Sequence, residues 1–513
     1  MRTKNSIKNM FVSILSNIVS IIVGLVAQAL FIKILGSAYL GLNSLFSNII
    51  SVLAIVEMGV GNAIIFNLYK PIAEDDREKI KSLMKYYKNS YRIIGCVVLM
   101  LGLSIIPALP FIIDFSSVTA DINIYLVYLL FLSDSVLSYF LVYKRSILYA
   151  NQKNYIINAI HIGYTIIVNI LQLSFLYLTH DYYLYLIIKI GMRVLENIVI
   201  TLIADKMYPY IKKDDGKKLD IETRNDITKK IKALFFHKVG SFVVLCTDNI
   251  IISKFLGLVM VGLYSNYYLI INSIQTVISQ IVQATTASVG NLLVTENKDK
   301  QFETFNKVRF LNFWLTTFSG AAILIVMSSF IRIWVGESYI LSDFVLVVLV
   351  INFYLSSTRT TYSVFKEAAG IYYEDRFVPI IESIINIVAS IILVKIYGLA
   401  GVFLGTICSS FALWGYSYPR FIYHDLLGGK YRNYIMETLE YFIVFIMVII
   451  ISYFSIHYII IANPYLQFIV SLIIAIILPN IILLLKYYDT DEYKYFKELI
   501  HKLFSKFKFR KNA

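Results

Sequence analysis

The chain has 513 residues, of which 58% are hydrophobic and only 16% are charged. An ordinary soluble protein is about half apolar and about a quarter charged, so this composition excludes a soluble protein of such length. The apolar runs also leave no room for a separate catalytic domain, since each membrane-spanning helix needs about 20 apolar residues. A formal net charge of +14 would indicate nucleic acid in a soluble protein, whereas in a membrane protein it raises the question of which side holds the cations.

Fourteen apolar runs are long enough to span a membrane as helices. They are continuously apolar, whereas the strands of a membrane β-barrel would place a polar residue at every second position. The predicted fold class is therefore an all-α polytopic membrane protein with about 14 transmembrane helices. The runs lie at 10–32, 40–66, 93–113, 122–143, 155–178, 182–204, 233–253, 261–292, 310–331, 339–358, 378–394, 399–419, 438–459 and 464–485.

The predicted spans divide into two pseudo-symmetric six-helix lobes followed by two C-terminal helices. The N-lobe is predicted at 1–204, a charged cytoplasmic linker at 205–232, the C-lobe at 233–423, the last two spans at 424–486 and a basic cytoplasmic tail at 487–513. The linker is expected to form an amphipathic helix along the inner surface. Because the tail adjoins a span, its aromatic residues and lysines indicate binding to anionic lipid headgroups rather than stacking on nucleic acid.

The distribution of lysine and arginine predicts the orientation. If the N-terminus is cytoplasmic, 40 of the 47 Lys and Arg residues lie in inner segments, and the opposite orientation would place nearly all of them outside. Both termini are therefore predicted to be cytoplasmic, and the first run, which is too long for a signal peptide, is predicted to be an uncleaved span. Every outer loop is short, which disfavours a membrane polymerase or ligase with an outer catalytic loop and favours transport.

A short motif recurs in the two halves, 221 residues apart. Each copy has a lysine, two glycines and a serine at the same spacing, at the turn between the first and second span of its half. The copies are Lys33, Gly36, Gly41 and Ser44, and Lys254, Gly257, Gly262 and Ser265, with a weaker third copy at Lys395, Gly398 and Gly401. The motif predicts a duplicated six-helix unit with a substrate path between the halves, although glycine turns at membrane surfaces also resemble one another by chance.

Two segments resemble a known family. The first, EMGVGNAIIFNLYKPIAEDD at 57–76, runs from the second predicted span into its cytoplasmic loop, and the second is TDNIIISKFLG at 247–257. Both are similar to the lipid-linked oligosaccharide flippases of bacterial capsule and O-antigen clusters, which belong to the multidrug/oligosaccharidyl-lipid/polysaccharide (MOP) exporter superfamily. The resemblance extends over essentially the whole chain, with two six-helix lobes, a charged linker and two extra helices.

This resemblance implies a flippase rather than an enzyme. The protein would move an undecaprenyl-diphosphate-linked oligosaccharide repeat unit across the bacterial plasma membrane by alternating access, for capsule, O-antigen or exopolysaccharide synthesis. The implied partners are this lipid-linked glycan, membrane lipids, and a polysaccharide polymerase with other assembly proteins, but no nucleic acid. A multidrug exporter and a lipid II flippase of the same superfamily are alternatives, and a membrane polysaccharide polymerase or ligase is an alternative from another class.

Charged residues inside the predicted spans are candidate site residues, because each is costly in hydrocarbon. Lys189, Arg193 and Glu196 are spaced by four and then three residues, which places them on one helix face. Guanidinium forks suit phosphate oxygens and lysine adds a point charge, so this face is predicted to bind the diphosphate or an acidic sugar. The alternative is an internal ion pair between Arg193 and Glu196 that only stabilises the helices.

Two further carboxylates lie in predicted spans of the same lobe and are included in the substrate site. Glu57 precedes Gly59 and Gly61, and Asp134 stands between two serines. Either carboxylate is predicted to pair with the cations of span 182–204 or to carry a proton. Small neighbours also allow helices to approach closely, so the alternative for Glu57 is a carboxylate paired across a helix interface.

By the same resemblance, a coupling cation would bind in the second half. Asp248, Glu382, Asn386 and Thr406 would form a sodium or proton site, since oxygen ligands suit a hard cation. The alternative for Asp248 is a position near the outer surface. The three cysteines and six histidines lack the spacing of a metal site, so no metal site and no cofactor apart from the coupling ion are expected.

Overall fold

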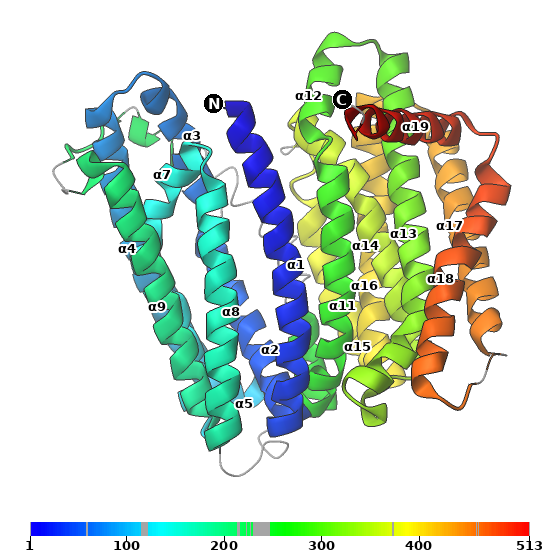
Figure 1. Cartoon of the computed structure of the whole chain (residues 1–513), viewed down its shortest axis with the longest axis horizontal. Helices are drawn as coiled ribbons and strands as arrows, with labels where there is room; N and C mark the ends of the chain where they lie inside the picture. Colours follow the sequence, from blue (N-terminus) through cyan, green and yellow to red (C-terminus); the bar gives the residue numbers. More distant parts are fainter. Residues whose placement is uncertain are drawn as a thin grey trace. The chain divides into compact units, whose positions relative to one another are not determined.

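Every regular element in the part of the chain that the structure describes is a helix, which confirms the predicted all-α fold class (Figure 1). The structure is a computed structural model. It describes residues 2–57, 60–113, 122–212, 216–221, 223–225, 227–228, 247–371, 374–457, 459 and 461–511. The chain divides into two compact units, residues 1–265 and 266–513.

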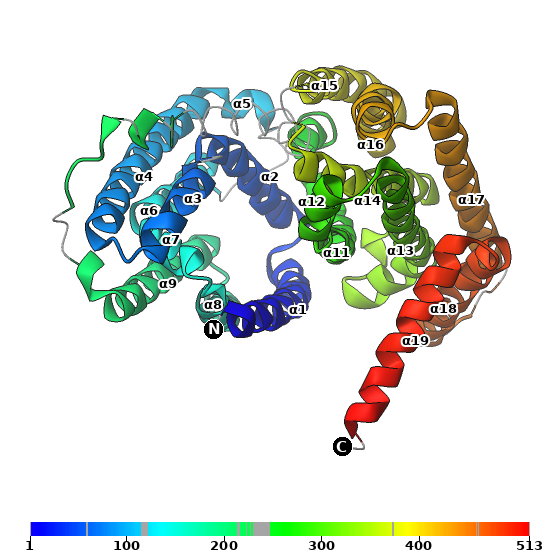
Figure 2. The same ribbon diagram turned by 90° about the horizontal axis from the view of Figure 1, so that it is seen from above.

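The described part of the first unit contains long helices and two short ones, α5 and α7. Its α1, α8, α9, α6 and α4 pack in that order, each against the next, and α2 contacts both α1 and α6 (Figure 2). The helices are α1 (Arg2–Leu35), α2 (Ser37–Leu53), α3 (Val60–Ala73), α4 (Arg77–Ile105), α5 (Leu109–Ile112), α6 (Ile124–Leu141), α7 (Arg145–Ala150), α8 (Asn154–Thr179) and α9 (Tyr182–Met207), with further helical residues at 247–256.

In the second unit α13 contacts α14, α17 and α18, and α15 packs closely against α16. The close approach depends on small residues, because a Cβ on Gly405 would lie only 2.2 Å from the Ser390 Oγ. The boundary between the units falls within α11. The helices are α11 (Leu258–Gln283), α12 (Thr286–Thr295), α13 (Lys298–Trp334), α14 (Asp343–Ala369), α15 (Val378–Tyr397), α16 (Leu399–Ala412), the π-helix η7 (Leu413–Leu426), α17 (Tyr431–His457), α18 (Pro464–Tyr487) and α19 (Asp491–Lys511).

Twelve helical stretches in the described residues are long and apolar enough to cross a membrane. They correspond to twelve of the fourteen predicted spans. The predicted span 182–204 contains three charged residues and corresponds to the 26-residue helix α9, which is long enough but is not among the twelve. Most of the predicted span 233–253 lies outside the described residues, where only 247–253 is helical.

The helix α18 illustrates how these helices divide their surfaces between protein and lipid. Its buried residues recur every four positions and form one stripe of Ser471, Ala475, Pro479, Leu483 and Tyr487. The stripe faces α13, with the Trp314 Nε1 donating to Asn480 Oδ1 at 3.0 Å. Leucine and isoleucine cover the other side and are about half exposed, as a surface in contact with lipid tails would be.

The two copies of the repeated motif meet in a reciprocal contact inside the first unit. A Cβ on Gly41 would lie 1.9 Å from the Leu258 carbonyl oxygen, and one on Gly262 would lie 2.0 Å from the Ser37 carbonyl oxygen. The turn glycines Gly36 and Gly257 have φ of 87° and 86°, the left-handed region that glycine adopts without strain. Ser265 Oγ also donates to Ser44 Oγ at 2.7 Å. Residues 221 positions apart thus occupy equivalent places, which favours duplication over chance.

Outside the spans, part of the predicted linker packs against the first turns of α4. The Lys85 ammonium donates to the Gly216 carbonyl oxygen at 2.9 Å, and Lys79 forms an ion pair with Asp220. Hydrogen bonds from Lys79 and Thr223 lower the pKa of the Asp220 carboxyl. Nine of the 28 residues of the predicted linker lie outside the described residues, and residues 216–220 are not helical, so the described part of the linker is not one continuous amphipathic helix. The predicted domain limits stay predictions.

Candidate functional site

The helix α9 has a charged face and an apolar face on opposite sides. It begins after Asp181, whose carboxylate accepts hydrogen bonds from the backbone N–H groups of Tyr183 and Leu184. Lys189, Arg193 and Glu196 contact side chains of α6, α7 and α8, as their spacing on one face predicts. The exposed apolar residues of α9 are Ile187, Leu195, Ile198, Val199 and Leu202.

Asp134 of α6 lies against both cations of α9. Its Oδ1 is 2.7 Å from the Arg193 Nε, and its Oδ2 is 3.8 Å from the Lys189 Nζ. The predicted pairing of Asp134 with these cations is therefore confirmed. The side chains of Arg193 and Lys189 are 36% and 25% exposed, whereas Asp134 is 12% exposed. Two partly accessible cations thus share one carboxylate.

Glu196 does not pair with Arg193, so the alternative of an internal ion pair in α9 is not what the structure contains. The Glu196 carboxylate lies 3.3 Å from the Arg145 Nη2 of α7 and 3.0 Å from the His161 Nδ1 of α8. The same Arg145 nitrogen donates to the Asn197 Oδ1 at 2.8 Å. Glu196 is buried, with 4% of its side chain exposed, while His161 is 44% exposed. Because the Arg145 guanidinium lies against Glu196, Arg193 is not required to neutralise this carboxylate.

Glu57 lies in a separate cluster with aromatic neighbours. It is at the end of a 3-10 turn after α2, and it accepts a hydrogen bond from the Tyr91 hydroxyl of α4. Tyr91 in turn contacts the Tyr87 hydroxyl at 3.3 Å. The structure thus pairs Glu57 with a tyrosine across a helix interface and forms no ion pair between it and Lys189 or Arg193.

In the second unit, Glu382 is bound by an arginine that is not among the predicted site residues. The Arg359 Nη2 of α14 donates to both Glu382 carboxylate oxygens, at 2.7 and 2.9 Å. The Arg359 Nε donates to the Tyr418 hydroxyl of η7 at 3.3 Å. Asn386 and Thr406 do meet, since the Asn386 Nδ2 donates to the Thr406 Oγ1 at 3.0 Å. Asp248, the fourth predicted ligand, belongs to the first unit.

Two more buried ion pairs lie in the second unit. Lys366 of α14 pairs with Asp375, whose side chain is fully buried and also accepts from the Ser417 Oγ at 2.9 Å. Arg309 of α13 lies 2.9 Å from the Glu437 Oε2 of α17 and is 8% exposed. Each of these cations has its own carboxylate.

Arg359 is not among the predicted site residues because the predicted span 339–358 stops one residue before it, which places this arginine in a predicted cytoplasmic segment. The helix α14 continues to Ala369 and ends where Gly370 adopts a φ of 71°. The stretch from 356 to 363 contains no glycine or proline, and that signal would have extended the predicted helix past the charge.

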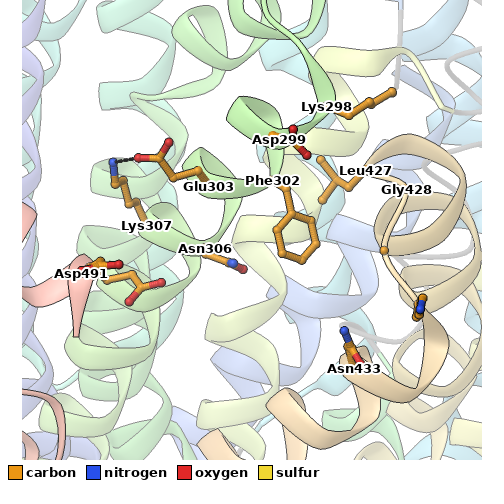
Figure 3. A pocket seen from close by; sticks show the side chains of 13 residues that line it. Lys298, Asp299, Phe302, Glu303, Asn306, Lys307, Leu427, Gly428, Asn433 and Asp491 are labelled. Carbon is orange, nitrogen blue, oxygen red and sulfur yellow. Dashed lines mark hydrogen bonds and ion pairs between the residues drawn. The ribbon is translucent and has the colours of Figure 1, made fainter. Parts of the chain in front are cut away.

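A cavity of about 720 Å³ lies at one end of the second unit, away from all the predicted site residues. Its walls are the first turns of α13, the 427–430 segment before α17, and the first turn of α19. Figure 3 shows Phe302 projecting into the cavity, with the ion pair of Lys307 and Glu303 to one side. Both carboxylates and ammonium groups line it, so its charge selects no one kind of ligand.

Comparisons with known proteins give one family and several similar folds. The sequence profile of a family described as "Polysaccharide biosynthesis protein" matches residues 6–286, which is more than half of the 513-residue chain. A search among curated proteins finds no match in sequence.

The most informative solved structures are membrane transporters. "Lipid II flippase MurJ, inward closed conformation" aligns with a TM-score of 0.67 and 16% identity, covering 94% of this chain and 99% of that chain. A multidrug resistance MATE family transporter of the MOP superfamily, inward-facing, aligns with a TM-score of 0.63 and 16% identity, covering 79% and 95%. A mutant of the Vibrio cholerae MATE transporter VcmN aligns at 0.56 and 12%, covering 81% and 95%. With the twelve apolar helices, these similarities identify a multi-pass membrane protein with the MOP transporter fold.

Proposed function

Because the chain belongs to the polysaccharide biosynthesis protein family, we propose that it is a flippase for a lipid-linked polysaccharide repeat unit. Its cargo would be an oligosaccharide on undecaprenyl diphosphate, moved from the inner to the outer leaflet of a bacterial plasma membrane by alternating access. The termini would be cytoplasmic, as the position of 40 of the 47 Lys and Arg residues indicates.

The observation that carries this proposal is the excess of accessible cation at α9. Lys189 and Arg193 share the single carboxylate of Asp134, and both cations are partly exposed. A charged group is costly in a membrane span unless it is paired or faces a polar path, so two cations on one carboxylate suit an anionic cargo. The cluster would bind the diphosphate or an acidic sugar of the cargo.

The contact between Asp134 and Arg193 suggests how this carboxylate could orient the guanidinium for an anion. The Arg193 Nε lies 2.7 Å from the Asp134 Oδ1 in an ion pair without hydrogen-bond geometry, and a guanidinium has five N–H donors in total. These donors would bind phosphate oxygens while the ion pair with Asp134 stays in place. Lys189 adds a point charge one turn away on the same face. Asp134 would therefore orient the arginine and need not leave when the anion binds.

Deleting the gene tests the proposal. The expected result is that undecaprenyl-diphosphate-linked repeat units accumulate on the inner leaflet and that surface polysaccharide falls, with both restored by a plasmid copy. A plasmid copy carrying Arg332→Gln is a matched control, because Arg332 is 45% exposed and pairs with an exposed glutamate. Unchanged surface polysaccharide in the deletion strain would contradict the proposal.

The second candidate cargo is lipid II, which is favoured by the length over which the lipid II flippase aligns, 99% of that chain. The two cargoes are separated by complementation. If the chain carries lipid II, its expression restores growth to a strain depleted of its own lipid II flippase. If it carries a polysaccharide repeat unit, that strain stops growing and only surface polysaccharide depends on the chain.

A further inference from the structure

Glu382, one of the predicted ligands of a coupling cation, already has a cation. The Arg359 Nη2 lies 2.7 and 2.9 Å from its two carboxylate oxygens. Only 2% of the Glu382 side chain is exposed. A guanidinium is permanently charged, so a sodium ion at this carboxylate would lie against a fixed positive charge. The residues present therefore do not fit a metal cation at Glu382.

The two neighbouring ligands are also engaged. Asn386 directs its amide nitrogen at the Thr406 Oγ1, at 3.0 Å, and the Thr406 hydroxyl donates to the Val402 carbonyl oxygen at 3.4 Å. An amide N–H is a hydrogen-bond donor and cannot coordinate a cation. Both side chains are buried, at 0% and 8% exposure. The hydrogen bond thus joins the two side chains to each other, and the Asn386 group that faces Thr406 is a donor rather than an oxygen ligand.

Arg359 joins elements that surround these predicted ligands. It projects from α14, binds Glu382 of α15 through Nη2, and binds Tyr418 of η7 through Nε. Ser417, which precedes Tyr418 in η7, donates a hydrogen bond to Asp375. Asp375 in turn pairs with Lys366 of α14. Arg359 therefore provides both a positive charge at the buried carboxylate and a link between three helices.

We infer that Arg359 is a built-in counter-cation that fills the cation position of Glu382, so that the second unit binds no sodium ion there. This inference goes beyond the proposed flippase function and does not depend on the cargo. It therefore predicts that Glu382, Asn386 and Thr406 do not form a sodium site. Its test measures ion binding rather than transport, so the two proposals can fail separately.

The experiment is thermal unfolding of the purified full-length protein in detergent, in sodium chloride and in choline chloride of equal ionic strength. A ligand that binds only the folded state raises its melting temperature. The wild type is expected to melt at the same temperature in both salts. Arg359→Gln, which leaves the Glu382 carboxylate without its cation, is expected to gain a sodium-specific rise of about 2 °C or more.

Two further variants complete the test. Arg359→Gln combined with Glu382→Gln should lose the sodium response again, because the carboxylate is gone. Arg420→Gln is the matched control, since it removes an exposed arginine of η7 that pairs with Asp425 and should leave the salt response unchanged.

A wild type that sodium stabilises, with the effect removed by Glu382→Gln, would overturn the inference. A folded Arg359→Gln protein that gains no sodium response would also contradict it, because the ion pair would then be structural only. If Arg359→Gln does not fold, the comparison of the wild type with Glu382→Gln still decides between a sodium site and a closed ion pair.

Discussion

The charged clusters of the two units differ in the balance of cations and carboxylates and in how deeply the carboxylates are buried, since Asp134 is 12% exposed. In the first unit Lys189 and Arg193 share one carboxylate, and the arginine side chain is 36% exposed. In the second unit Arg359 and Lys366 each have a carboxylate of their own, and those carboxylates are 2% and 0% exposed. The first cluster has positive charge to offer an anion, whereas the second has neutralised its charges internally.

This difference shows that a charge inside a membrane span does not by itself mark a binding site. An intramembrane charge is either paired or faces a polar path, and only the second case leaves it available to a ligand. Both clusters have the same residue types, so composition does not separate them. The ratio of cations to carboxylates does, because two cations share Asp134 whereas Arg359 and Lys366 each have a carboxylate, and this ratio assigns binding to the first cluster and helix linkage to the second.

The largest expected effect is on stability, and it should appear in the second cluster alone. Asp375→Asn leaves the Lys366 ammonium buried without a counter-charge, and removing one partner of a buried ion pair costs about 3–5 kcal/mol. Asp134→Asn should cost much less, because Lys189 and Arg193 are partly exposed.

Thermal unfolding of both variants in detergent measures this contrast, with Asp299→Asn as a control at an exposed carboxylate on the rim of the cavity. If Asp134→Asn destabilised the protein as much as Asp375→Asn, the first cluster would be as closed as the second, and the comparison between them would fail.

The next effect is on transport and should appear in the first cluster alone. Arg193→Ala is expected to lower the export of surface polysaccharide at least about tenfold, because a hydrogen bond to a charged group contributes about 1.5–3 kcal/mol. Arg193→Lys should fall between this variant and the wild type, since lysine keeps the charge but lacks the fork. Export is measured in the complemented deletion strain and normalised to the amount of folded protein. Normal export by a well-folded Arg193→Ala protein would remove the site.

The smallest effect concerns the ion pair of Lys79 and Asp220 outside the spans. The lowered pKa of Asp220 means that its contribution to stability is present above the pKa of the unfolded chain and is lost only as the pH falls toward the lower folded value. Between pH 7 and pH 5 this pair should therefore change nothing. Lys79→Gln should shift the melting temperature by no more than about 1 °C, since half of the Asp220 side chain is exposed. A larger shift would mean that the linker is a main support of the first unit.

The charged face of α9 was predictable because helical periodicity is a local property. The spacing of Lys189, Arg193 and Glu196 decides that they share a face whatever surrounds the helix. The partners were not predictable with the same certainty. Asp134 was one of two carboxylates expected to meet the cations, and nothing in the spacing links Glu196 to Arg145 or His161, which are 51 and 35 residues away.

The second cluster shows that a predicted helix should not be ended at its first charged residue. Arg359 lies ten residues before the end of α14 at Ala369, so its position is interior to the helix. A span predicted from hydropathy ends at Arg359, because hydropathy counts every arginine as exposed to water. In the structure Glu382 neutralises Arg359, and the helix continues. The glycine repeat, in contrast, could be found from the sequence, because the close backbone contact at Gly41 and Gly262 leaves no room for a side chain.

The most direct test of the account is the affinity of the purified protein for undecaprenyl diphosphate, compared between the wild type, Arg193→Ala and Arg359→Gln. The account predicts that Arg193→Ala weakens binding at least about tenfold, while folded Arg359→Gln binds as the wild type does, since only the first cluster offers positive charge to an anion. Equal affinity of the wild type and Arg193→Ala, with binding lost in Arg359→Gln, would contradict the assignment of the two clusters.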